Sequence, residues 1–148
     1  MSGPRFARPD DLEAVLALHR DFFAEDHYPY DEKETRGNLA LLLSDPSLGR
    51  VFVLEEDGSP AGYLALTFGF SLEFSGRNGL VDELYVAPGH RGRGHGTQAL
   101  AAAEKLCREL GIRALHLVVE RYKEAAQALY RRVGFVAYER NVMSKTLD

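Results

Sequence analysis

The chain has 148 residues, of which 45% are hydrophobic and 27% charged, and its formal net charge is −4. We therefore expect one globular domain with a sizeable core over residues 1–148, and the acidic balance argues against a dedicated nucleic-acid-binding protein. No apolar run reaches the ~18 residues that a membrane span needs, so no membrane contact is expected. Residues Met1 to Arg5 lack the apolar core of a signal peptide. The single cysteine excludes an internal disulfide and suits a reducing cytoplasm, so we expect a cytoplasmic protein.

The first half of the chain predicts a strand, two helices and a hairpin. Apolar side chains and one histidine recur at helical spacing: Leu12, Val15, Leu16, His19, Phe22 and Phe23. The polar stretch from Glu25 to Tyr30 interrupts this pattern, and Asp57-Gly58 is a hairpin signal. The expected segments are a strand over residues 5–8, helices over 12–23 and 31–43, and strands over 51–55 and 61–70.

The second half of the chain alternates strands and helices. We expect a strand over 80–86, a long helix that ends near Gly111, a strand over 114–119, a helix over 124–133 and closing strands over 135–139 and 142–146. The order is β-α-α-β-β-β-α-β-α-β-β. Periodicity alone predicts an α/β or α+β fold.

A glycine- and arginine-rich turn joins the strand that ends at Val86 to the long helix. Gly92, Gly94 and Gly96 let the main chain approach a ligand closely and adopt positive φ at little steric cost. The turn can present a row of N–H groups, and the helix start adds the positive end of its dipole. Arg91 and Arg93 strengthen the positive field. Such a turn is suited to binding a pyrophosphate.

The turn resembles that of the Gcn5-related N-acetyltransferase (GNAT) family, which reads Arg/Gln-x-x-Gly-x-Gly/Ala. The segment Arg91 to Gly96 fits every fixed position, and the segments Asp82 to Val86 and Ala128 to Phe135 occur at the family's usual distances. The resemblance covers essentially the whole chain. It implies a single domain with a mixed, mostly antiparallel sheet flanked by helices, acetyl-CoA as cosubstrate and a homodimer.

The resemblance also implies which residues bind acetyl-CoA. The main chain of the strand would pair with the pantetheine arm, and the turn would bind the pyrophosphate. Lys123 stands where many relatives have an asparagine that contacts the pantetheine; a lysine could reach a coenzyme phosphate or point into water. The predicted coenzyme-binding residues are Leu84, Tyr85, Val86, Arg91, Gly92, Arg93, Gly94, His95, Gly96, Thr97 and Lys123.

Acetyl transfer to an amine needs a base for the amine and an acid for the leaving thiolate. Asp82 is the predicted base, since a partly desolvated carboxylate beside the thioester would have a raised pKa; the alternative is that Asp82 and Glu83 are only charges at a strand edge. The resemblance implies that Tyr130 is the acid, since family members commonly have a tyrosine near the coenzyme sulfur at this position, and a phenol pKa of ~10 suits protonation of a thiolate; the alternative is a packed tyrosine. The five histidines show no metal-binding spacing, so no metal is expected.

The acceptor is suggested by the stretch from Ser71 to Val86, which looks like the diamine/polyamine (spermidine/spermine and thialysine) branch of the family. Asp82 matches that branch's catalytic glutamate, and Glu83 its substrate-facing aspartate. Two carboxylates favour a small cationic amine by Coulomb attraction. His27, Tyr28 and Tyr30 would form the other wall of the acceptor site, unless they are only part of a polar surface loop.

Several other acceptors and functions remain open at this point. Aminoglycosides are also polycationic. Acetylation of peptide N-termini is disfavoured, because Val118 stands where the branch of the family that acetylates ribosomal-protein N-termini has its base. A dinucleotide-binding module is another interpretation, since Gly94-x-Gly96-x-x-Ala99 opens a helix and Glu120 follows the next strand. A non-catalytic coenzyme A sensor could share the scaffold.

Overall fold

The computed structural model describes residues 3–148, so Met1 and Ser2 of the N-terminal segment lie outside the described residues. The chain divides into two compact units, one ending at Val118 and the other running from Val119 to Asp148, and each is described by itself. The first unit holds β1 (Gly3–Phe6), η1 (Pro9–Asp11), α1 (Leu12–Glu25), α2 (Glu32–Ser44), β2 (Gly49–Glu56), β3 (Ser59–Ser71), β4 (Gly76–Val86), η2 (Pro88–His90), α3 (His95–Glu109) and β5 (Leu115–Leu117). The second holds α4 (Glu124–Arg132).

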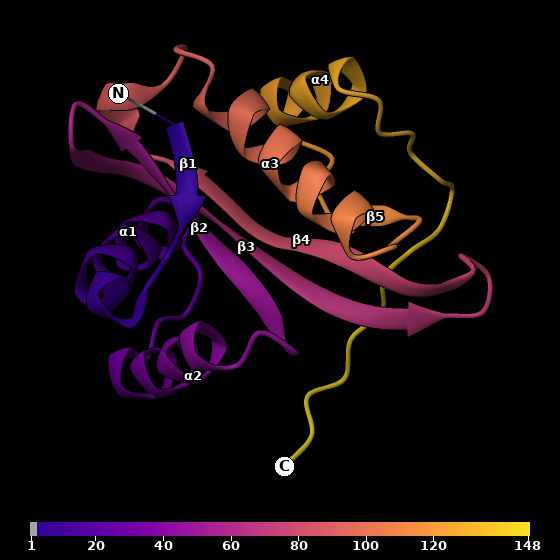
Figure 1. The fold of residues 1–148 in the computed structure, drawn as a ribbon, viewed down its shortest axis with the longest axis horizontal. Helices are drawn as coiled ribbons and strands as arrows, with labels where there is room; N and C mark the ends of the chain where they lie inside the picture. Colours follow the sequence, from indigo (N-terminus) through magenta and orange to yellow (C-terminus); the bar gives the residue numbers. More distant parts are fainter. Residues whose placement is uncertain (1–2) are drawn as a thin grey trace. The chain divides into compact units, whose positions relative to one another are not determined.

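The first unit is a sheet in the order β1-β2-β3-β4-β5 with helices on both faces. Strands β1 to β4 pair antiparallel, and β4 pairs with β5 in parallel. Helices α1 and α2 lie against one face of the sheet and α3 against the other (Figure 1). The predicted α/β fold with a mixed, mostly antiparallel sheet is confirmed. A dinucleotide-binding module, which needs a parallel doubly wound sheet, is wrong for this chain.

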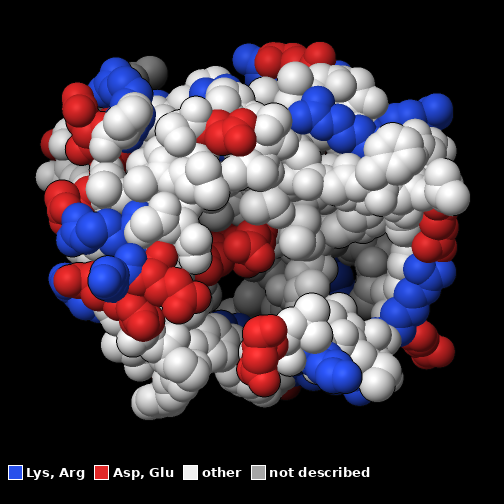
Figure 2. Space-filling model, turned by 90° about the horizontal axis from the view of Figure 1, so that it is seen from below, with Lys and Arg blue, Asp and Glu red and all other residues white. Residues whose placement is uncertain are grey.

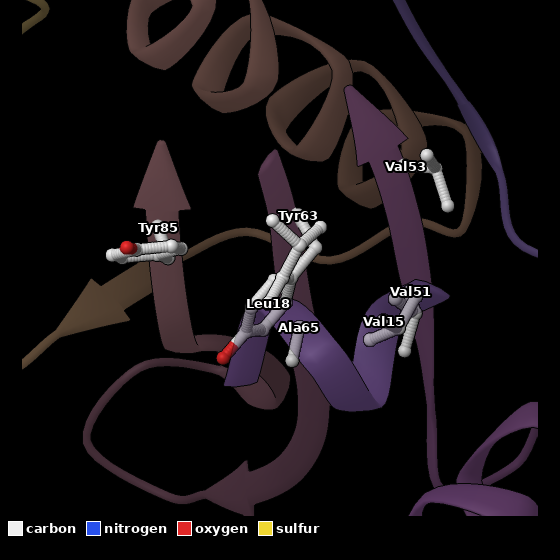
Figure 3. Packing of buried hydrophobic residues seen from close by; sticks show 7 residues of the cluster. All are labelled: Val15, Leu18, Val51, Val53, Tyr63, Ala65 and Tyr85. Carbon is white, nitrogen blue, oxygen red and sulfur yellow. The ribbon is translucent and has the colours of Figure 1, made fainter. Parts of the chain in front are cut away.

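The face of the sheet beneath α1 carries the aromatic part of the core. Tyr63 and Tyr85 project from neighbouring strands, Leu18 of α1 lies by Tyr63 and Ala65, and Val15 of α1 belongs to the same cluster (Figure 3). All five side chains are buried. Since α1 is fixed by this apolar contact, polar side chains on the same helix face are held at defined positions above β3 and β4.

The two closing strands predicted over 135–139 and 142–146 are absent from the described chain, where α4 is the last regular element. The residues concerned are exposed: the relative solvent accessibility is 77% for Val136 and 92% for Met143. A strand satisfies its main-chain N–H and C=O groups only by pairing with a neighbour. The residues after α4 pair with no strand among residues 3–148, so their β propensity is not sufficient to form one.

Strand β4 contains a β-bulge at Asp82. Ala65 of β3 pairs with Glu83 and Leu66 pairs with Val81, so Asp82 is an extra residue on β4. Before the bulge, a Cβ on Gly79 would lie 2.9 Å from Cys107 Sγ of α3, which shows that Gly79 and Val81 face α3. After the bulge, Glu83 and Tyr85 face α1. The extra residue therefore turns the functional end of β4 toward the α1 side.

Two further expectations concern boundaries and membranes. β5 is shorter than predicted, spanning Leu115–Leu117 instead of residues 114–119. Among the described residues, the structure contains no helix with the length and apolarity that crossing a membrane requires.

The close approach of β3 and β4 at Gly62 generates a stability prediction. An added Cβ there would lie 2.2 Å from the carbonyl oxygen of Tyr85, so Gly62→Ala must push apart the strands that hold the site. We expect the free energy of unfolding in urea to fall by about 2 kcal/mol or more. The matched control is Gly37→Ala on the exposed face of α2, where nothing lies within 4 Å, and it should stabilise by ~0.5–1 kcal/mol. Equal effects of the two substitutions would contradict this packing.

Candidate functional site

The glycine turn has the backbone geometry of an anion-binding helix start. Gly92 and Gly94 have φ values of +76° and +86°, whereas Gly96 lies within α3, so two of the three predicted glycines use the left-handed region. Gly94 is the N-cap of α3, and no side chain caps this end of the helix. The first N–H groups of α3 are therefore directed outward with the positive end of the dipole, as binding of a diphosphate requires.

The carboxylate of Glu56, at the end of β2, holds the basic side chains around this turn. Its Oε1 lies 2.9 Å from His95 Nε2, and its Oε2 lies 3.0 Å from His90 Nδ1 and also accepts from the Arg93 guanidinium. The hydrogen bond with His95 contributes most to lowering the pKa of the Glu56 carboxyl, and the hydrogen bond with His90 and the charge of Arg93 lower it further. The His95 side chain is only 6% exposed, so its predicted coenzyme contact is left to its main chain.

Potential metal ligands come together at Glu56, His90 and His95. Within residues 3–148, the ligand atoms of Glu56, His90 and His95 all lie within 4.8 Å of one another. Mutual hydrogen bonds account for this convergence, and Arg93 places a positive charge on the carboxylate that a cation would need. We therefore keep the expectation that the protein needs no metal.

Arg91 is bound on the strand side of the turn. Its Nε donates to the carbonyl oxygen of Val86 at 2.8 Å, and its guanidinium pairs with Glu25 of α1 at 2.8 Å. The guanidinium carbon also lies 5.6 Å from the centre of the Tyr85 ring. Arg91 thus ties the turn to the end of α1, and Glu25 offsets part of the positive charge that the sequence predicted for the turn.

Within the described residues, one edge of β4 carries no strand partner beyond the bulge. Pairing with β5 ends at Val81–Leu117 in the described chain, while β4 continues to Val86. Ala87 N–H donates to Ala61 O toward β3, and main-chain groups alternate along a strand, so those of Leu84 and Val86 point to the open side. This edge can pair with an extended ligand, as predicted for the pantetheine arm.

Asp82 and Glu83 have different surroundings although they are adjacent. Asp82 is an exposed residue on the bulge. Desolvation by the surrounding protein, then the negative charge of Glu83, raises the pKa of its carboxyl, and His19 acts in the opposite direction. Asp82 therefore combines access to solvent with a raised pKa, which suits a base.

Glu83 is engaged by two buried side chains on the α1 side of the sheet. Tyr63 Oη donates to Glu83 Oε1 at 2.7 Å, and His19 Nδ1 lies 2.9 Å from the same oxygen. Burial, followed by the charge of Glu83, raises the pKa of the Tyr63 hydroxyl well above its usual range, so it stays protonated and donates. Glu83 is thus fixed by the protein and is less available than Asp82.

The predicted acceptor loop between α1 and α2 contains both exposed and packed residues. His27 is exposed and has a φ of +59°. Tyr28 packs edge-on against Phe23, with ring centres 5.3 Å apart. Tyr30 lies over α1, with its ring centre 5.7 Å from that of His19. Of these three residues, Tyr30 is the one that lies beside the cluster formed by Glu83, His19 and Tyr63.

Tyr130 and Lys123 belong to the second unit. Tyr130 lies in α4 with its ring centre 6.0 Å from that of Phe135, and burial raises the pKa of its hydroxyl. Lys123 is the residue before α4, and its N–H donates to Glu120 O. A protonated phenol is compatible with an acid, and both roles remain predictions.

Sequence reasoning missed Glu56, Tyr63 and the polar role of His19. His19 was predicted only as part of the buried face of the first helix, although a histidine on an otherwise apolar face requires a buried polar partner. Glu56 and Tyr63 reach the site through strand pairing. No spacing in the sequence marks either residue.

Comparison with protein families matches residues 12–135 to the acetyltransferase (GNAT) family. Streptothricin acetyltransferase of Streptomyces lavendulae is 28% identical, over 88% of this chain and 79% of its own length. Aminoalkylphosphonate N-acetyltransferase of Salmonella typhimurium is 29% identical, over 88% of this chain and 82% of its length.

A solved structure has the same fold. An integron cassette protein from the mobile metagenome of Cole Harbour Salt Marsh is 31% identical and superposes with a TM-score of 0.88, over 98% of this chain and 90% of the other. The expected fold and family are therefore confirmed. The named relatives do not single out the diamine/polyamine branch.

The Glu56 network predicts a pH dependence of stability. A carboxyl with a lowered pKa in the folded state stabilises the protein above its ordinary value of 4.5, and this contribution is lost as the pH falls through the lowered value. In urea titrations, Glu56→Gln should therefore lose less stability than the wild type between about pH 5 and 3. Glu104→Gln, on the exposed face of α3, is the control and should follow the wild type. A wild-type profile for Glu56→Gln would show that the network does not stabilise the turn.

Proposed function

Since the chain belongs to the acetyltransferase (GNAT) family, we propose that it acetylates a small cationic amine, such as a polyamine, a diamine or a diamino acid. The protein is an acetyl-CoA-dependent N-acetyltransferase, as the family and its named relatives show. The choice of acceptor is our inference. So are direct attack in a ternary complex, the homodimer and the cytoplasmic location.

The bulge in β4 is the observation that carries the choice of acceptor. It inserts the exposed residue Asp82 directly before Glu83, at the point where the open edge of β4 begins. The two carboxylates interact, since the charge of Glu83 contributes to the raised pKa of Asp82. Two carboxylates attract an ammonium group and repel an anionic acceptor. The loop residue Tyr30 lies beside His19 of α1, which in turn contacts Glu83.

The described residues fit acetyl-CoA. The uncapped start of α3, from Gly94 to Thr97, has the N–H donors for a diphosphate, and Arg93 adds positive charge nearby. The edge at Leu84 and Val86 has main-chain groups for an extended pantetheine, apart from the Val86 carbonyl, which accepts from Arg91. When bound, acetyl-CoA supplies the activated acetyl group. The protein's task is to hold it, orient the amine and move protons.

Asp82 takes the proton in the mechanism that we propose. Its raised pKa keeps it a usable base, and its exposure lets it accept a proton from the amine directly or through water. The amine nitrogen then attacks the thioester carbon, a carbon–nitrogen bond forms and the carbon–sulfur bond breaks. Tyr130 gives a proton to the leaving sulfur in this proposal. The nitrogen loses its extra proton to water as the amide forms, and Tyr130 is reprotonated from solvent. Cys107 is buried and has a raised pKa, so we infer no acyl-enzyme.

The relatives favour a second group of acceptors. One is named for streptothricin and another for aminoalkylphosphonates. The acidic pair argues against a phosphonate, which carries negative charge, and leaves polycationic antibiotics such as aminoglycosides as the alternative acceptor class.

The test is thiol release from acetyl-CoA across a panel of amines. The panel contains polyamines, diamines, diamino acids, aminoglycosides, an aminoalkylphosphonate and N-terminal peptides. We expect kcat/KM to be highest for a small di- or polycationic amine and to fall as salt rises, because screening weakens the attraction to the acidic pair. A preference for the phosphonate or for peptides would refute the proposed acceptor.

Asp82→Asn tests the base. Asp82 is active when ionised, so wild-type kcat/KM should rise as the pH passes upward through its pKa, which lies above the ordinary aspartate value of ~3.9. In Asp82→Asn this acidic limb should flatten and kcat should fall by roughly 10²-fold or more. The control is Asp10→Asn, at an exposed position in η1, which should keep the wild-type profile. Should the limb persist in Asp82→Asn, another group is the base.

A further inference from the structure

Beside the predicted acceptor site, α1 carries a buried histidine that the mechanism above does not use. The His19 side chain is only 10% exposed, and its ring packs on Phe23 with centres 4.0 Å apart. Nδ1 lies 2.9 Å from Glu83 Oε1 and 3.3 Å from Tyr63 Oη. The contacts with β3 and β4 fix Nδ1, and they therefore also fix the direction in which Nε2 points.

The hydrogen-bond partner at Nδ1 determines the tautomer. A carboxylate accepts hydrogen bonds and donates none, so Nδ1 carries the proton that it shares with Glu83. In the neutral ring, Nε2 is then an acceptor with a free lone pair. Tyr63 donates to the same carboxylate oxygen at 2.7 Å, and this second hydrogen bond holds Glu83 in place behind the imidazole.

Nε2 is buried, and no group among residues 3–148 hydrogen-bonds to it. The same holds for the hydroxyl of Tyr30, whose ring centre lies 5.7 Å from that of His19. Buried polar atoms normally have partners. Two such atoms on neighbouring rings, beside a pair of carboxylates, therefore point to a ligand with N–H groups.

We propose that His19 Nε2 and the Tyr30 hydroxyl bind the acceptor amine, an inference that rests on the proposed function. Nε2 accepts an N–H hydrogen bond from the amine, and the Tyr30 hydroxyl contacts the same group. Tyr30 lies on the connection between α1 and α2, outside any helix or strand. A rotation of its side chain admits the amine without disturbing the sheet.

This arrangement divides the work between the two acids of β4. Asp82 stays available for the proton, while Glu83 acts through His19 by fixing its tautomer and orientation. His19 is therefore a specificity-determining residue. It favours acceptors that present an N–H donor and disfavours those that present only acceptors, because Nε2 would be left without a partner.

The experiment compares His19→Gln with His19→Asn. The glutamine amide can place an acceptor oxygen near the position of Nε2, whereas the asparagine amide reaches only the position of Nδ1. With the best amine of the panel, we expect His19→Asn to raise the KM of the amine by about tenfold or more, as for a lost hydrogen bond to a charged group. His19→Gln should stay much closer to the wild type. The KM of acetyl-CoA should be unchanged in both variants.

Two controls separate binding from folding. Thermal unfolding of both variants reports any loss of structure. The second control is His116→Gln, at a histidine on β5 away from His19 and Glu83. It should leave the KM of the amine and the KM of acetyl-CoA unchanged. Equal amine KM values for the Gln and Asn variants, or a parallel change in the KM of acetyl-CoA, would overturn the role of His19 alone. A wild-type protein that acetylates no amine would overturn this inference together with the proposed function.

Discussion

The site depends on a single extra residue in β4. Without the bulge at Asp82, strict alternation would keep Glu83 and Tyr85 on the α3 side with Gly79 and Val81. With it, Glu83 reaches His19 and Tyr63 beneath α1. The pairing of β4 with β5 also ends just before the bulge. One local irregularity thus turns an acid toward the acceptor side and begins the open edge on which the coenzyme is expected to lie.

Charge is arranged around this strand in two separate groups. Basic side chains surround the start of α3 and are held by one carboxylate, Glu56. Acidic side chains stand at the bulge. Over the wider surface, acidic and basic residues are intermixed on the face that Figure 2 shows, and ion pairs such as Arg36–Glu13 and Arg20–Glu32 link α1 and α2. The two functional groups are therefore local features on a surface of mixed charge, and they suit a donor with phosphates and an acceptor with amines.

The sequence predicted the fold well where its signals are local. Helical spacing and turn residues place α1 to α4 and β1 to β5 in the correct order, and the glycine pattern predicts the uncapped start of α3. The closing strands were wrong because strand formation depends on a partner that local β propensity does not provide. Glu56 and His19 were missed as site residues for a related reason, since their partners are brought to them by strand register and by the packing of α1. The bulge itself depends on the pairing of β3 with β4, and no residue type marks it in the sequence.

The most direct test is a crystal structure with acetyl-CoA bound. We expect the diphosphate to lie within hydrogen-bonding distance of the main-chain N–H groups at the start of α3, and the thioester to lie along the open edge of β4 beside Asp82. Acetyl-CoA bound elsewhere, with no phosphate contacting the N–H groups of that helix start, would show that the proposed binding site is wrong.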